Sequence, residues 1–334
     1  MRYRSFGNTG LEVSYLSYGA APLSCMYGDL SDDDAKYAVH MAIDSGINYF
    51  DVAPGYGPNG LAEERLGTAL EGSRHKIILA TKTGRYDTGA YQAPNYEFAY
   101  DKKTVRTEFE KSLRRLRTDY VDVLQVHDIT NSRELSYILE ETVPELEKLR
   151  DEGKIRFIGI TSLYLDALKY VLDRSSSVDA VLNFCRYNLA DTSLNGYFRE
   201  DIEKRGLALV NASILFMGML TCNNKTVVRV RKSEKFAALR EAVQIACKLC
   251  ETEGTTLPEQ AFLFGMEYRE AATTLVGMGR PESVRRNLDM LDKSCDKNLC
   301  AKLQIILAGK SGFPDMGQAG GISLHPSPGA GSGT

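Results

Sequence analysis

Short apolar runs alternate with amphipathic segments along most of this chain. The apolar runs have the length and the β-branched content of strands. They cover residues 15–18, 48–50, 77–80, 121–126, 156–160, 180–182, 207–211 and 273–276. Between them apolar residues recur at helical spacing, for example over residues 33–44, 103–116 and 135–151. Eight strands with intervening helices predict an α/β protein whose parallel strands close into a (β/α)₈ TIM barrel, rather than an open sheet.

Helix boundaries and domain limits can be predicted from local signals. Ser31 precedes three aspartates, which suits an N-cap and the positive end of a helix dipole. Gly153 follows an acidic pair and can end its helix in the left-handed conformation. We expect residues 1–310 to form one barrel domain that ends in a C-terminal helix. Residues 311–334 are rich in Gly, Ser and Pro, so we expect this tail to be mostly disordered.

Composition narrows the classes of protein that fit. The 334 residues include 43% hydrophobic positions, enough for a large core, and the net charge of −3 gives no reason to expect nucleic-acid binding. No apolar run approaches the roughly 18 residues of a membrane span, and the N-terminus lacks an apolar signal region. Seven irregularly spaced cysteines indicate free thiols in a reducing cytosol. We therefore expect a cytoplasmic protein without membrane contacts.

One group of cysteines has the composition of a metal site. Cys247 and Cys250, together with Cys295 and Cys300, could in principle supply four thiolates to zinc. The first two fall within a helical pattern over residues 236–251, where a spacing of three usually marks a core-facing surface. The core interpretation is the stronger of the two, and we expect no metal.

Four polar residues at successive strand ends carry the candidate chemistry: Asp51, Tyr56, Lys82 and His127. A barrel builds its active site at these ends. Tyrosine ordinarily titrates near pH ~10, and an ammonium such as Lys82 would lower that pKa. Asp51 would hold the lysine, and His127 would donate a hydrogen bond to a substrate oxygen. None of these groups provides a hydride, so redox chemistry at an alcohol carbon needs a cofactor such as a nicotinamide.

Each of the four residues also has a structural interpretation. Asp51 could cap a loop, Lys82 could be solvated, Tyr56 could pack on a rim and His127 could be a core histidine. For any one residue alone, this interpretation is the better one. Their joint placement at strand ends favours the catalytic interpretation.

The segments that contain these residues resemble the aldo-keto reductase superfamily. Residues 49–57 (YFDVAPGYG), 80–84 (ATKTG) and 124–128 (LQVHD) match its catalytic blocks in order and spacing, and residues 4–14 look like its N-terminal β-hairpin. Within the superfamily the chain is most similar to the branch of L-galactose dehydrogenases and aldose 1-dehydrogenases, in residues 153–161, 170–174 and 183–187.

The resemblance assigns a set of positions to an NAD cofactor, with NADP possible. They are Gly19, Ala20, Thr161, Ser162, Asn183, Ala212, Ser213, Leu215, Gly277, Met278, Gly279, Arg280, Ser283 and Asn287. Many relatives have an aromatic residue at Ala212, which this chain lacks, and Ile214 replaces a frequent proline. Ser283 stands where many NADP-dependent relatives carry arginine, which favours NAD, although Arg280 lies nearby.

Substrate contacts are expected from Tyr86, Tyr91 and Asp128. The two tyrosines belong to an aromatic-rich stretch, residues 85–100, that would overhang the active-site face. Its aromatic rings could stack on a sugar, or the loop could simply pack on itself, and the sequence favours neither interpretation.

The activity implied by the resemblance is NAD(P)-dependent oxidation of C1 of an aldose, of the L-galactose or L-fucose type, to a lactone. An alternative is a general NADPH-dependent reductase of aldehydes and ketones, because the same four residues would serve it. A third is a non-catalytic nucleotide-binding regulator, since some members of the superfamily are channel subunits. The expected partner is a small sugar or carbonyl compound, and a monomer or homodimer is equally consistent with the sequence.

Overall fold

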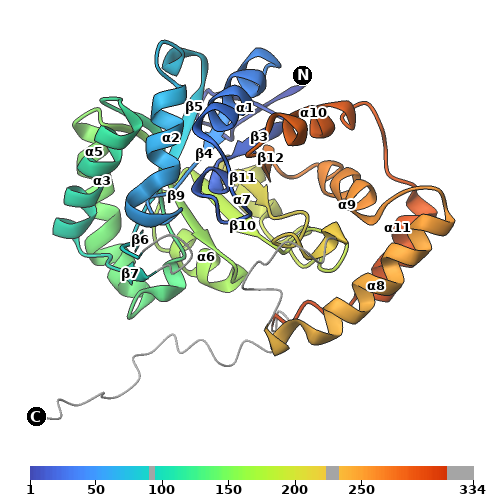
Figure 1. The fold of residues 1–334 in the computed structure, drawn as a ribbon. Helices are drawn as coiled ribbons and strands as arrows, with labels where there is room; N and C mark the ends of the chain where they lie inside the picture. Colours follow the sequence, from blue (N-terminus) through green and yellow to red (C-terminus); the bar gives the residue numbers. More distant parts are fainter. Residues whose placement is uncertain (90–94, 223–232, 314–334) are drawn as a thin grey trace, which may run out of the picture.

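A closed ring of eight parallel strands forms the centre of the molecule (Figure 1). The computed structural model describes residues 1–89, 95–222 and 233–313. The ring runs in the order β10-β11-β12-β3-β4-β5-β8-β9. These strands are β3 (Leu16–Gly19), β4 (Tyr49–Asp51), β5 (Ile78–Thr83), β8 (Val121–Val126), β9 (Ile155–Ser162), β10 (Ala180–Phe184), β11 (Ala208–Ala212) and β12 (Thr273–Gly277). The predicted (β/α)₈ barrel is confirmed.

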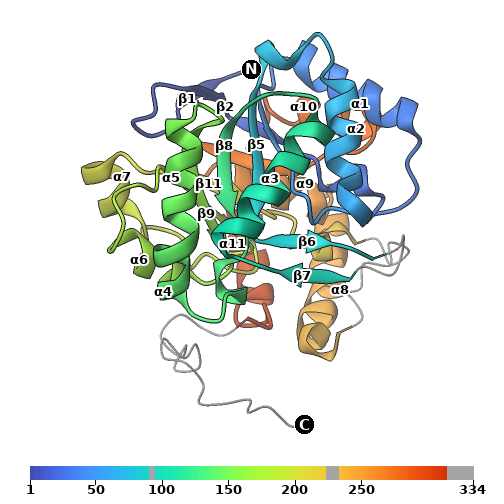
Figure 2. The same cartoon turned by 90° about the vertical axis from the view of Figure 1, so that its left-hand side faces the viewer.

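Helices surround the ring and cover its outer face (Figures 1 and 2). They are α1 (Asp32–Asp44), α2 (Leu61–Ala69), α3 (Lys102–Leu116), α4 (Leu135–Tyr137), α5 (Val143–Asp151), α6 (Leu165–Leu172), α7 (Arg199–Arg205), α8 (Ala237–Thr252), α9 (Leu257–Met266), α10 (Pro281–Asp289) and α11 (Lys297–Leu307). The outward-facing strand residues, such as Leu79 and Leu124, are buried in the main apolar core. This core joins strands to helices.

Inward-facing residues form a second, smaller core inside the ring. Because successive side chains of a strand point to opposite faces, the neighbours of the outward residues point inward. Tyr49, Ala80 and Val123 are buried together in this cluster. The N-terminal hairpin of β1 (Tyr3–Ser5) and β2 (Glu12–Ser14) adds Phe6, whose ring centroid lies 5.3 Å from that of Tyr49. The predicted hairpin is thus present and closes the amino-terminal end of the barrel.

Several strands continue further towards their carboxyl ends than the sequence predicts. β5 extends to Thr83 and β10 to Phe184, whereas the predictions stop at 80 and 182. Apart from Phe184 the additional residues of these two strands are polar, which made them resemble loops, but the barrel pairs their main chains with neighbouring strands. Lys82 therefore lies within a strand, where its backbone is fixed.

The helix predicted over residues 135–151 is interrupted. It consists of α4, a π-helical segment η5 (Ile138–Thr142) and α5. Pro144 occupies the first turn of α5 and has no amide hydrogen, so it cannot continue an α-helical hydrogen-bond ladder. Both predicted boundary signals are confirmed, since the Ser31 side chain accepts a hydrogen bond from the Asp34 amide and Gly153 has a φ of 73°.

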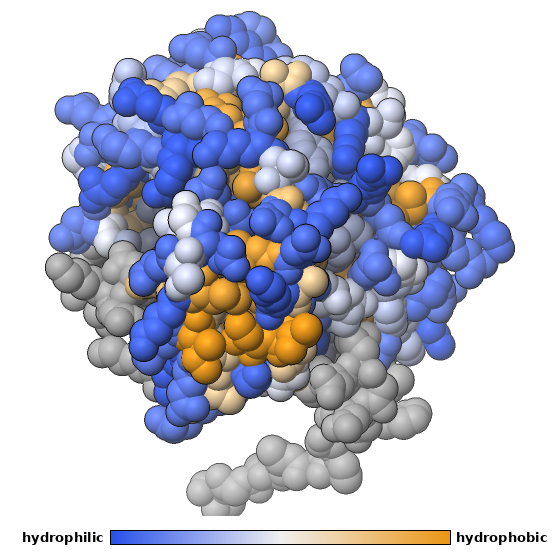
Figure 3. Space-filling view, turned by 90° about the vertical axis from the view of Figure 1, so that its right-hand side faces the viewer, coloured by the Kyte–Doolittle hydropathy of each residue, from blue (hydrophilic) through white to orange (hydrophobic). Residues whose placement is uncertain are grey.

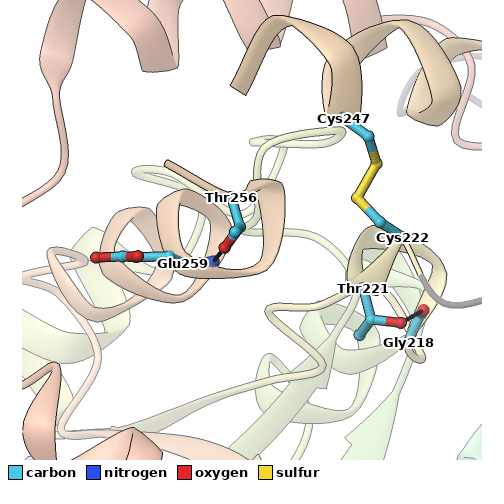
Figure 4. Close-up of a disulfide and its surroundings, with 6 residues drawn as sticks. All are labelled: Gly218, Thr221, Cys222, Cys247, Thr256 and Glu259. Atoms are coloured by element: carbon cyan, nitrogen blue, oxygen red, sulfur yellow. Dashed lines mark hydrogen bonds between the residues drawn. A yellow bond between two sulfur atoms is a disulfide. The ribbon is translucent and has the colours of Figure 1, made fainter. Parts of the chain in front are cut away.

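The prediction that all cysteines are free thiols is wrong for one pair. Cys222 and Cys247 form a disulfide between the turn η6 (Met219–Thr221) and α8, with their Cα atoms 6.3 Å apart (Figure 4). The fold brings together two cysteines that are 25 residues apart, which sequence spacing could not reveal. Of the two cysteines for which we predicted a core-facing position, Cys250 is buried in the main core and Cys247 is partly buried against it. In the described part of the chain, no group of three or more His, Cys, Asp or Glu side chains is arranged to hold a metal ion.

Helices α8 and α11 pack on each other on one side of the molecule. Figure 3 turns this side towards the viewer and shows an apolar area low on the face. Ile245 of α8 and Ile305 of α11 remain 58% and 78% exposed.

Of the described helices, none is long and apolar enough to cross a membrane. Nearly all of the tail predicted to be disordered, residues 314–334, lies outside the described residues.

Candidate active site

The four predicted catalytic residues meet at the carboxyl end of the barrel. They come from three strands rather than four, because Tyr56 lies on the loop after β4, the strand that ends with Asp51. Strand alternation explains why they meet. Asp51 stands two residues beyond inward-facing Tyr49, and Lys82 two residues beyond Ala80. β4, β5 and β8 are neighbours in the ring, so their inward side chains form the layer directly above the inner core.

Lys82 is the centre of the hydrogen-bond network. Its ammonium donates to a carboxylate oxygen of Asp51, to the main-chain oxygen of Val52 at 3.0 Å and to the Tyr56 hydroxyl at 3.2 Å. The side chains of Lys82 and Asp51 are each only 1% exposed. The ammonium therefore has its three donors occupied and its charge balanced away from water.

Burial shifts the pKa values of these groups. Burial raises the pKa of Tyr56 above its usual 10.0, and the positive charge of Lys82 only partly offsets this. Lys82 lowers that pKa, as expected, but loss of solvation and the nearby Asp51 carboxylate outweigh its charge, so the net shift is upward. Burial by itself would lower the pKa of Lys82, but Asp51 and Tyr56 raise it, so the lysine stays charged.

His127 faces Tyr56 across the site. The two ring centroids are 5.8 Å apart and the rings are nearly perpendicular. The pKa of His127 lies well below 6.5, because burial and then the charges of Lys82 and Arg85 disfavour the imidazolium. A neutral imidazole carries one N–H, and it can donate that hydrogen to a substrate oxygen.

The residue after His127 is held in an unusual conformation. Asp128 has a φ of 48°, its amide donates to the Thr161 hydroxyl at 2.9 Å, and its carbonyl accepts from the Tyr100 hydroxyl at 3.0 Å. The same Tyr100 hydroxyl lies 2.8 Å from the carbonyl of His127. Tyr100 therefore fixes the turn that presents both residues.

The aromatic-rich stretch after β5 forms a small antiparallel pair, β6 (Arg85–Asp87) and β7 (Tyr96–Phe98) (Figure 2). Tyr86 is buried, and its hydroxyl lies 2.8 Å from that of Thr83 and accepts from the Gly84 amide at 3.0 Å. Its hydroxyl thus serves the loop itself. Tyr91, the other predicted substrate residue of this stretch, lies outside the described residues.

The positions assigned to the cofactor occupy the rest of the ring. They lie at the carboxyl ends of β3, β9, β10, β11 and β12 or just beyond, and on α10. These five strands are consecutive in the barrel, and the three catalytic strands complete the circle. The Ala20 amide donates to the Asp51 carbonyl at 2.8 Å and so ties the two arcs together. One face of the barrel therefore presents both sets of residues.

The cofactor positions differ in how they are engaged. The Thr161 hydroxyl accepts a hydrogen bond from the Asp128 amide. The Ser162 hydroxyl accepts from the Tyr164 amide at 3.0 Å. Ala212 ends β11, Ser213 has a φ of 57°, and Leu215 accepts a main-chain hydrogen bond from Leu220. Gly277 pairs with Gly19 across the strands, and the Met278 amide donates to the Gly19 carbonyl at 3.2 Å.

Two buried amide side chains test whether a nicotinamide dinucleotide fits this arc. Asn183 donates to the Ser162 carbonyl at 2.8 Å, but its own Oδ1 has no partner in the described part of the chain. A carboxamide N–H of the nicotinamide would satisfy that oxygen. The Nδ2 of Asn287 on α10 is likewise buried without an acceptor there. The cofactor positions thus include two buried, unsatisfied groups of the kind that a dinucleotide would pair.

Two residues near the reacting groups were missed by the sequence reasoning. Gln125 donates to the second carboxylate oxygen of Asp51 at 2.7 Å, and an ideal Cβ on Gly159 would lie 2.7 Å from its Cγ. A polar residue inside the apolar run 121–126 was the available signal. Arg85 forms an ion pair with Asp128 at 2.9 Å. Only its position three residues after Lys82 could have indicated it.

The comparisons agree with this geometry. The sequence model of the Aldo/keto reductase family matches residues 15–308, and the chain belongs to that family. It is an NAD(P)-dependent oxidoreductase. An L-galactose dehydrogenase from Arabidopsis thaliana is 38% identical over 290 residues, which are 85% of this chain and 86% of the relative.

Two further relatives extend the likeness. A D-threo-aldose 1-dehydrogenase from a Pseudomonas species is 28% identical over 312 residues, covering 88% of this chain and 94% of that protein. Among solved structures, the holo form of an aldo-keto reductase from Bacillus halodurans has a TM-score of 0.73 and 26% identity, with 93% of this chain and 97% of that chain covered.

Proposed function

We propose that the protein oxidises C1 of an aldose, of the L-galactose or L-fucose type, to a lactone with NAD. The observation that carries the chemistry is the buried Lys82 ammonium, which donates to both Asp51 and the Tyr56 hydroxyl. The similarity to an L-galactose dehydrogenase and an aldose 1-dehydrogenase supports the substrate class.

In oxidation, Tyr56 accepts the proton of the anomeric hydroxyl, and the hydrogen on C1 leaves as hydride. An oxidised nicotinamide held by the cofactor positions would supply the acceptor for that hydride. Lys82 stabilises the tyrosine oxygen as it changes charge, and Asp51 keeps the ammonium in place. His127 donates a hydrogen bond to the substrate oxygen, which orients C1. In the reverse direction Tyr56 protonates a carbonyl oxygen.

The preference for NAD is proposed from the segment at the start of α10. The Arg280 guanidinium donates to the main-chain oxygen of Asp29 and lies 3.9 Å from the Asp34 carboxylate. The Ser283 hydroxyl donates to the Arg280 carbonyl at 2.6 Å. An acidic neighbour disfavours a 2′-phosphate, because that group carries negative charge of its own. Comparing kcat/KM with NAD and NADP tests this, and strong NADP selectivity would remove the proposal.

The activity is tested by mixing the enzyme with NAD and L-galactose, L-fucose or D-arabinose and following absorbance of the reduced nicotinamide. Tyr56→Phe should lower kcat by about 10²–10⁴-fold while cofactor binding is kept, because it removes only the proton-transfer group. Near-normal turnover of that variant would exclude Tyr56 as the acid–base. NADPH consumption with simple aldehydes, and none with sugars, would favour the general reductase.

We also propose a cytoplasmic location, since five of the seven cysteines are free.

A further inference from the structure

Arg85 and Asp128 form a salt bridge beside the catalytic residues. Arg85 follows Lys82 by three residues on β5 and β6, and Asp128 directly follows His127 after β8. The two side chains meet across these neighbouring strands, with Nη1 of the arginine 2.9 Å from Oδ2 of the aspartate. Two of the three catalytic strands, β5 and β8, are thus each followed by one member of the pair.

The main chain and neighbouring rings hold this ion pair rigidly. The Asp128 amide and carbonyl are both engaged, by Thr161 and Tyr100. The Arg85 guanidinium carbon lies 4.1 Å from the centroid of the Tyr96 ring. Its main chain packs against Gly55, where an ideal Cβ would come within 3.0 Å of the Arg85 carbonyl oxygen. A pair fixed before binding loses little side-chain entropy when a ligand arrives.

The pair is both close to the reacting groups and within reach of a ligand. Oδ2 of Asp128 is 3.8 Å from Nε2 of His127, the nitrogen closest to it. The side chains of Arg85 and Asp128 are 21% and 14% exposed, whereas those of Lys82 and Asp51 beneath them are 1% exposed. A group on the carbon next to the reacting one can therefore contact the pair while the reacting oxygen meets Tyr56 and His127.

The donors and acceptors of the pair match a hydroxyl group. Arg85 supplies only N–H donors, and its Nε is buried without an acceptor in the described part of the chain. Asp128 supplies acceptor oxygens. A hydroxyl donates one hydrogen bond and accepts others, so it can bind both partners at once. A simple aldehyde or alcohol has no such group on the neighbouring carbon.

We infer that Arg85 and Asp128 bind the C2 hydroxyl of the substrate and select sugars over carbonyl compounds that lack it. This inference rests on the proposed oxidation of an aldose and assigns the specificity within that site. A site built to hydrogen-bond a hydroxyl rejects analogues without it far more strongly than an apolar pocket rejects a missing methylene.

The test compares L-galactose with 2-deoxy-L-galactose in NAD reduction by the wild-type enzyme, Arg85→Gln and Asp128→Asn. We expect the wild-type kcat/KM to be at least about 100-fold higher for L-galactose. Each variant should lose about 30-fold or more with L-galactose and less than about threefold with the deoxy sugar, so that the ratio falls towards one. The two variants test the pair independently, and circular dichroism confirms that each is folded.

A matched control is Asp122→Asn at the opposite end of β8. Asp122 forms ion pairs with Arg74 at 2.9 Å and with Arg156 at 2.8 Å, so neutralising it should lower stability but keep the substrate ratio. Equal losses with both sugars in the Arg85 and Asp128 variants would overturn the inference and leave aldose oxidation intact. Failure of the wild-type enzyme to oxidise any aldose would remove the proposed function and this inference with it.

Discussion

Replacing Lys82 with methionine should destabilise the protein strongly, because it leaves a buried carboxylate without its counterion. Asp51 is 1% exposed, and in the variant its remaining side-chain donor is Gln125, at 2.7 Å. Breaking a buried ion pair by removing one partner costs about 3–5 kcal/mol. That is a large part of the total of about 5–15 kcal/mol for a typical domain.

A double-mutant cycle separates this charge effect from lost packing. Asp51→Asn removes the carboxylate charge, so the double variant Asp51→Asn/Lys82→Met should be less destabilised than the sum of the two single variants by about 2 kcal/mol or more. The free energy of unfolding is measured in urea by far-ultraviolet circular dichroism. The m-value, which is the slope of this free energy against urea concentration, should be the same for all variants.

The matched control is an ion pair on the surface. Lys204 and Glu200 lie 2.6 Å apart but are 72% and 70% exposed, so neutralising both should show no measurable coupling. Additive effects at Asp51 and Lys82, within the error found for the surface pair, would refute the argument that burial makes their pairing obligatory.

Three other predictions concern pH, the turn after β8 and the disulfide. Because the pKa of Tyr56 is raised above 10.0 and that of His127 lies well below 6.5, kcat/KM for oxidation should rise from about pH 6 to pH 9 without an inflection near 6.5. The value of kcat/KM for the reverse reduction should not change over this range. An inflection near pH 6.5 in either profile would contradict a neutral His127. Tyr100→Phe should lower the free energy of unfolding by about 1–3 kcal/mol and also lower kcat, because two main-chain carbonyls lose their donor; unchanged kcat and stability would show that the turn holds itself. Reducing the disulfide should lower the free energy of unfolding by about 3 kcal/mol in the wild-type enzyme and have no effect on Cys222→Ser, whereas a denaturation midpoint insensitive to dithiothreitol would show that the link to Cys247 contributes nothing.

The sequence by itself determined the barrel and the identity of its reacting groups. Strand and helix differ in the period of their apolar positions, so each element could be recognised from local residues alone. The carboxyl ends of parallel strands meet at one face, so the sequence alone predicted that Asp51, Lys82 and His127 lie together. Ser31 and Gly153 marked helix ends through their own local chemistry.

Only the tertiary structure decided how these groups act on one another. The pKa of Tyr56 is raised because the folded barrel removes its side chain from water. The order of residues along the chain does not give this degree of burial. The pairing of Arg85 with Asp128, the support of Asp51 by Gln125 and the link between Cys222 and Cys247 each join residues that are remote along the chain. Such contacts arise from ring closure and loop folding, and these depend on every element at once.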